Sequence, residues 1–253
     1  MVWWRTAAVV GAVVALVGCA KEESTGPTQP RNYFPLAVGN WWVYSGIRLD
    51  TSGAEMPGTE WRDSMVIVGQ VTHAGRQSYV AVRYRVGGGI PDVPDTMLLA
   101  TDGTRLYVFI EEFPIFGPTG WVKVADYSAS SWAIWDTTLT NVPIDSANSA
   151  VTTSGTMSWR GERGGTLSMT IKGRQVTAQE FRMRATYNGK LFVGGTEVGT
   201  LSFTLSLRQW VAEGIGIVRE QRDPSELRIQ SPLGGGVEME EGERTVLVDY
   251  HVR

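Results

Sequence analysis

Apolar and polar residues alternate with a period of two over most of the chain beyond residue 40. In 201–207 leucine and phenylalanine occupy every second position with serine and threonine between them, and 181–187 alternates apolar residues with arginine and threonine. This period predicts β-strands that bury one face. Asp102-Gly103 separates two such segments and predicts a tight hairpin, because both residues accept positive φ.

The pattern predicts roughly a dozen short strands. Besides those above, strands are expected around 42–44 and at 60–71, 77–86, 97–100, 105–111, 121–127, 150–159, 166–172, 226–230 and 244–252. In 77–86 three valines and Tyr84 share one face, opposite Arg83 and Arg85. The glycine-rich 161–165 predicts a turn. Residues 128–148 have no firm period, so a short helix or a long excursion is expected there.

Short strands joined by hairpin turns indicate an all-β domain built on one antiparallel sheet. Because each strand has one apolar face, the other face is expected to be wet or to line a cavity. The expected architecture is a single curved antiparallel sheet, either a half-barrel or an open barrel. A two-sheet β-sandwich is the alternative.

The N-terminus has the form of an export signal. Arg5 carries the only charge before residue 19, and an uncharged run of small and apolar residues occupies 6–17. A positive residue followed by a short apolar run is typical of a secretory signal. As a helix, this run is too short for the ~30 Å hydrocarbon core of a bilayer. Residues 1–18 are therefore predicted to be a removable signal peptide.

The signal ends in Leu16-Val17-Gly18-Cys19, which contains the only cysteine of the chain. This sequence resembles the lipobox of bacterial lipoproteins, although alanine or serine is commoner at the position of Val17. The resemblance implies diacylglyceryl transfer to the Cys19 thiol, cleavage after Gly18 and acylation of the new amino terminus. Two or three acyl chains hold a protein durably on a membrane. Since Ala20 is not aspartate, the resemblance favours the outer membrane in an organism with two membranes.

A polar linker, 19–32, follows the signal and is expected to be a flexible tether before a β-rich domain at 33–253. The opening of that domain resembles a Tyr-Phe-Pro, Gly-x-x-Trp-x-Tyr signature of bacterial lipoproteins of unknown function. Residues 214–219 resemble a Gly-x-Gly-hydrophobic-Val-Arg strand entry of the same group. The resemblance implies a curved half-barrel of the LolA and LolB type.

Composition narrows the classes of function. The net charge is −3 and no basic patch stands out, so nucleic acid is not an expected partner. A lone cysteine provides no disulfide framework, so the apolar core must stabilise the domain. The two histidines, His73 and His251, have no ligand-spaced neighbours, and no metal site or other cofactor is expected. There is no Gly-x-Ser-x-Gly motif either, so no enzymatic role is expected.

Ten tryptophans make aromatic residues the remaining candidates for a binding site. Most are expected to pack in the core, because each aromatic side chain buries a large apolar area. The others could line a groove for a hydrophobic ligand, and the candidates are Trp42, Tyr44, Trp61, Tyr84 and Trp210. The expected role is therefore binding of a hydrophobic ligand or an envelope component. The alternatives are an adaptor with a fully packed domain and, more remotely, a hydrolase.

Overall fold

The computed structural model describes residues 32–87, 94–111, 117–145, 148–232 and 234–253. The described strands, in chain order, are β1 (Trp41–Leu49), β2 (Trp61–His73), β3 (Arg76–Gly87), β4 (Asp95–Asp102), β5 (Arg105–Ile110), β6 (Gly120–Asp126), β7 (Ser131–Asp145), β8 (Asn148–Ile171), β9 (Arg174–Val193), β10 (Thr196–Ala212), β11 (Gly216–Arg222), β12 (Ser225–Gln230), β13 (Gly236–Glu240) and β14 (Gly242–His251). Within these ranges no helix is long and apolar enough to cross a membrane.

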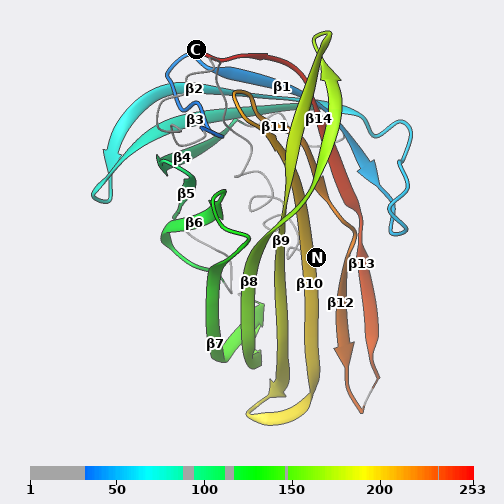
Figure 1. Ribbon diagram of the computed structural model, residues 1–253. Helices are drawn as coiled ribbons and strands as arrows, with labels where there is room; N and C mark the ends of the chain where they lie inside the picture. The colour runs from blue at the N-terminus through cyan, green and yellow to red at the C-terminus, as the bar shows by residue number, and fades with distance from the viewer. Residues whose placement is uncertain (1–31, 88–93, 112–116, 146–147, 233) are drawn as a thin grey trace.

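All strands belong to one antiparallel sheet. Its main path runs β6-β5-β4-β3-β2-β1-β14-β11-β10-β9-β8-β7, and β12 and β13 extend from β10. The sheet curls until it nearly closes into a barrel (Figure 1). The prediction of a single curved antiparallel sheet is confirmed, and the sandwich alternative is not what forms.

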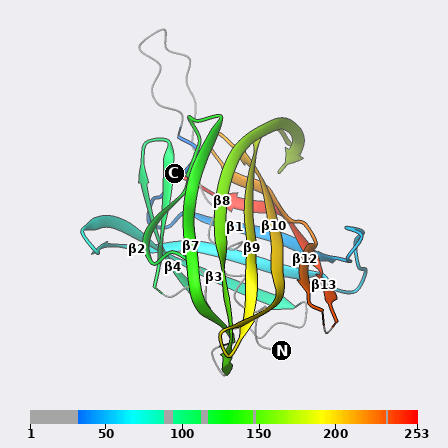
Figure 2. The ribbon, with the colours of Figure 1, turned by 90° about the horizontal axis from the view of Figure 1, so that it is seen from below.

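The long strands give the barrel two different halves. β10 pairs with β11 over Leu207–Ala212 and with β12 over Thr200–Thr204. Seen from below, β1–β4 run across behind β7–β10 (Figure 2). The lower parts of β8–β10 extend beyond this crossing together with β12 and β13 (Figure 1). The lower half is therefore a curved sheet flanked by β7 on one side and β13 on the other.

The main core lies inside the upper half and is completed by the segment before β1. Tyr33 and Phe34 are buried there, and the ring of Tyr33 lies 5.2 Å from that of Tyr127. Tyr127 in turn contacts Phe181 of β9 at 4.7 Å. The backbone N–H of Gly214 donates to the carbonyl of Asn32 at 3.4 Å. The domain thus begins inside its own barrel.

Residues 161–165, predicted to be a turn, lie within the continuous strand β8, so that prediction was wrong. Gly161 lies under the indole of Trp132, where a Cβ would overlap the ring. The register shifts between Arg163 and Thr166. Gln179 Nε2 donates to the carbonyls of Gly164 at 2.7 Å and of Gly165 at 2.8 Å. Gln179 of β9 therefore provides the hydrogen bonds that the carbonyls of this bulge need. From the sequence alone, the glycine-rich bulge resembles a turn.

Residues 128–148, expected to be a helix or an excursion, contain strand β7, so this prediction was also wrong. β7 pairs with β8 through register shifts at Ala133/Trp135, Leu139/Val142 and Pro143/Asp145. The first two shifts are one-residue bulges, and each exchanges the inward and outward positions of β7 relative to β8; the third is a two-residue shift and does not. These shifts break the two-residue period by which the other strands were recognised.

The proposed anchor lies outside the described residues. Residues 1–31 contain the predicted signal peptide, Leu16, Val17, Gly18 and Cys19, and all of the predicted tether except Asn32. Their assignments stay predictions from the sequence.

Candidate ligand-binding face

Three of the five candidate aromatics face the inside of the barrel. Trp42 is fully buried, and its Nε1 donates to the carbonyl of Ile215 at 2.7 Å. The hydroxyl of Tyr44 donates to the carbonyl of Ile217 at 3.2 Å. Trp61 is buried next to them on β2. Trp42 and Tyr44 thus join β1 to Ile215 and Ile217 across the core.

The other two candidates lie on the opposite face of the sheet, where Tyr84 is exposed and Trp210 is buried. Tyr84 is 46% exposed, because the inward residues of β3 are Ala81, Arg83 and Arg85. Trp210 is covered by two arginines, with the guanidinium of Arg219 4.6 Å from its ring. The five aromatics are thus divided between two faces of the sheet and do not form one surface.

An apolar surface lies instead on the inner face of the lower half. Leu201, Phe203 and Leu205 of β10 point to the same side as Ala185 and Tyr187 of β9. We call the inner-facing residues of this half the apolar stripe, and its members on neighbouring strands are Met157, Trp159, Leu191, Leu227 and Ile229. Alternation in 181–187 and 201–207 was the sequence signal for it.

Part of the apolar stripe is incompletely covered. Phe203, Leu205, Leu227 and Ile229 are all partly exposed. Leu227 and Ile229 also line a depression of about 390 Å³ whose other wall is 234–238. Apolar side chains that are half covered, on a concave surface, are suited to contact with an apolar ligand.

The base of the apolar stripe is held in place by Tyr187. Its hydroxyl lies 2.6 Å from Thr153 Oγ1, and that oxygen donates to the carbonyl of Lys190 at 2.9 Å. A Cβ at Gly189 would overlap this hydroxyl, so the ring lies along its own strand. Phe203 stacks on Tyr187 with ring centroids 5.7 Å apart. The stripe is thus a packed layer with fixed ring orientations.

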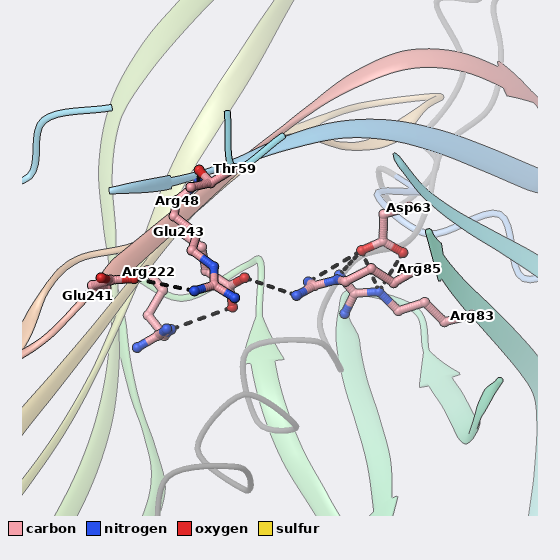
Figure 3. A network of polar contacts seen from close by, with 8 residues as sticks. All are labelled: Arg48, Thr59, Asp63, Arg83, Arg85, Arg222, Glu241 and Glu243. Carbon is pink, nitrogen blue, oxygen red and sulfur yellow. Dashed lines mark hydrogen bonds and ion pairs between the residues drawn. The ribbon is translucent and has the colours of Figure 1, made fainter. Parts of the chain in front are cut away.

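A row of charged residues crosses the inner face of the barrel, and Figure 3 shows its part from Asp63 to Arg222. It begins at Asp63, which Arg83 Nε contacts at 2.8 Å. Arg85 Nη1 then donates to Glu243 Oε2 at 3.1 Å, and Arg222 Nε lies 3.6 Å from Glu243 Oε1. We call Asp63, Arg83, Arg85, Glu243, Arg222 and Glu240 the charged row.

The charged row becomes more accessible along its length. The side chain of Asp63 is 1% exposed, whereas those of Glu243 and Glu240 are 19% and 20% exposed. Arg222 Nη1 donates to Glu240 Oε2 at 3.0 Å. Asp63 and Arg83 therefore form a buried structural pair, while the side chains at the other end of the row are partly exposed.

A buried carboxyl, Glu220, lies beside the charged row. Gln209 Nε2 donates to Glu220 Oε2 at 2.6 Å. Burial raises the pKa of Glu220 to about 7, although the positive charge of Arg83 opposes the shift. Burial also raises the pKa of Tyr44, helped by the negative charges of Glu220 and Asp63.

The charged residues are the functional candidates that the sequence did not reveal. They come from two groups of strands that are far apart along the chain, β2 and β3 in one and β11, β13 and β14 in the other. In 77–86, moreover, the valines indicate the buried face, whereas the arginines occupy it. Only the barrel places Arg85 and Arg222 on either side of Glu243.

Comparison with known proteins gives distant likenesses. No family model and no curated protein matches the sequence. A candidate lipoprotein from Parabacteroides distasonis is 12% identical with a TM-score of 0.44, and the match covers 88% of this chain and 100% of the other. A candidate exported protein with a YmcC-like fold from Bacteroides fragilis is 12% identical with a TM-score of 0.38, covering 86% and 98%. Neither likeness determines a family or a role for this chain.

Proposed function

We propose that this protein is a lipid-anchored protein of the bacterial envelope whose barrel binds a hydrophobic ligand along the apolar stripe. The anchor rests on the lipobox sequence that ends at Cys19. The binding role rests on one observation: the inner face of the lower half is apolar, and its residues 203, 205, 227 and 229 on β10 and β12 are only partly covered. Binding without catalysis is proposed, so no reaction is assigned to the barrel.

The occupant that this face suits best is an acyl chain. Partly exposed apolar side chains are available on β10 and β12, and an acyl chain needs no specific polar partner along its length. An adaptor that recognises a protein would not require a half-covered apolar layer inside the barrel. The anchor would keep the protein near a supply of acyl lipids.

The test uses the mature chain from residue 19 with Cys19→Ser, purified without detergent. Native mass spectrometry and solvent extraction should find co-purifying acyl lipid, and a fluorescent fatty acid should bind and be displaced by unlabelled fatty acid. Phe203→Glu places a charge in the apolar stripe and should abolish this binding. Ser202→Glu is the matched control, because Ser202 is the neighbouring residue on the opposite face of β10.

Circular dichroism checks that both variants keep the β-sheet. If the mature Cys19→Ser chain without a further substitution neither carries nor binds acyl compounds, the proposal is overturned. The adaptor is then the better description. Equal binding by Phe203→Glu and Ser202→Glu would also overturn it, because the ligand would then lie elsewhere.

A further inference from the structure

The charged row and the apolar stripe meet at one place in the barrel. Leu207 of β10 continues the inward face that carries Phe203 and Leu205. Directly opposite Leu207 on β11 is Arg222, and opposite Arg222 on β14 is Glu243. A ligand that lies along the stripe therefore ends next to partly exposed charges.

The accessible part of the charged row alternates in sign. Arg85, Glu243, Arg222 and Glu240 follow one another as positive, negative, positive and negative, each joined to the next by an ion pair. Their side chains are 13–20% exposed. A headgroup with a single charge would complement half of these residues and repel the others, whereas a zwitterionic headgroup can pair with both kinds.

The length of the apolar stripe fits one acyl chain. Leu201 is buried, but Ile229 opposite it on β12 is partly exposed, and from that level to Leu205 four residues rising about 3.3 Å each cover roughly 13 Å. One leaflet contributes about half of the ~30 Å hydrocarbon core. A chain of ordinary membrane length can thus lie along the stripe with its head at Arg222.

We propose that the ligand is an amphiphile with a zwitterionic phosphate headgroup, its chain on the apolar stripe and its head on the charged row. The phosphate is placed near Arg222 and Arg85, and the ammonium near Glu243 and Glu240. This inference rests on the proposed binding of an acyl ligand and adds the class of headgroup and the orientation.

The test compares three single-chain lipids with the same acyl chain, each below its critical micelle concentration: lysophosphatidylethanolamine, lysophosphatidylglycerol and a monoacylglycerol. Binding is measured by displacement of a fluorescent fatty acid from the mature Cys19→Ser chain. The zwitterionic lipid should bind about tenfold more tightly than the other two. This is expected because it alone can form one charge-assisted contact with an arginine and one with a glutamate.

Arg222→Gln should reduce the affinity for lysophosphatidylethanolamine to that for the monoacylglycerol, and should leave the monoacylglycerol unaffected. Arg184→Gln is the matched control, because Arg184 is exposed on the outer face of β9. Should Arg222→Gln lose its β-sheet spectrum, Glu240→Gln replaces it, with the same loss of discrimination expected.

The outcomes separate this inference from the proposed function. Equal binding of all three lipids overturns the headgroup inference and leaves acyl binding intact. Preference for lysophosphatidylglycerol also overturns it, because the row would then act as a positive site. If none of the three binds, both proposals fail.

Discussion

The indole of Trp61 lies across Gly46, its partner in the β1–β2 pair, so closely that a Cβ on Gly46 would overlap the ring. The guanidinium of Arg85 lies 4.6 Å from the ring of Trp61. A glycine thus lets a tryptophan lie flat on the sheet and leaves room for an arginine above it. This contact connects the strand packing to the charged row.

Gly46→Ala should destabilise the domain. The added methyl forces Trp61 off β1, and overpacking of this kind costs about 1–3 kcal/mol. Chemical denaturation of the mature Cys19→Ser chain measures the change. Gly69→Ala is the control, because a Cβ at Gly69 meets no atom within 4 Å. If the two variants lose the same stability, the contact with Trp61 is not the cause.

Asp63→Asn should destabilise the domain strongly. It leaves Arg83, whose side chain is 10% exposed, buried without the carboxylate that it hydrogen-bonds. Removing one partner of a buried ion pair typically costs about 3–5 kcal/mol. Glu197→Gln breaks an exposed pair with Lys190 and should cost less than about 1 kcal/mol. Urea denaturation of both variants, side by side, tests the prediction, which similar midpoints would contradict.

Stability should fall as the pH rises through neutrality, because of Glu220. In the folded chain burial raises its pKa from 4.5 to about 7. The folded state therefore keeps a proton that the unfolded state releases, and stability declines between about pH 4.5 and pH 7. A shift of this size corresponds to about 3 kcal/mol.

Glu220→Gln removes this titration and should flatten the same part of the profile. Unfolding free energies of the two chains, measured from pH 4.5 to pH 8, give the comparison. An unchanged slope in Glu220→Gln would show that other groups cause the pH dependence.

The sequence predicted the strands wherever the pairing is regular. Residues 201–207 and 181–187 alternate without interruption, because β9 and β10 pair without a register shift from Val211 back to Gly199. The prediction from sequence failed in β7, where bulges interrupt the alternation. It also failed in β8, where Gln179 of the neighbouring strand donates hydrogen bonds to a glycine-rich bulge. Local patterns cannot reveal side-chain partners supplied by another strand.

The candidate site was harder to predict than the fold. Apolar residues of β10 were recognisable from their period, but the inner face of β3 carries Arg83 and Arg85, whereas its valines face outward. Arginines are tolerated inside because Asp63 and Glu243 pair with them, and those carboxylates are 20 and 158 residues away in the chain. Hydrophobicity alone assigns the wrong face to such a strand.

Cys19→Ser should release the protein from membranes. If the lipobox at 16–19 is modified as its resemblance to bacterial lipoproteins implies, the cysteine thiol is the point of attachment, and serine cannot form the thioether. Durable attachment needs more than one acyl chain, so loss of the diacylglyceryl group should move the protein to the soluble fraction. Fractionation after labelling with a radioactive fatty acid measures both attachment and label. Gly18→Ala keeps a small residue before the cysteine and should retain both. Membrane retention of an unlabelled Cys19→Ser protein would show that the chain is held by something other than lipid on Cys19.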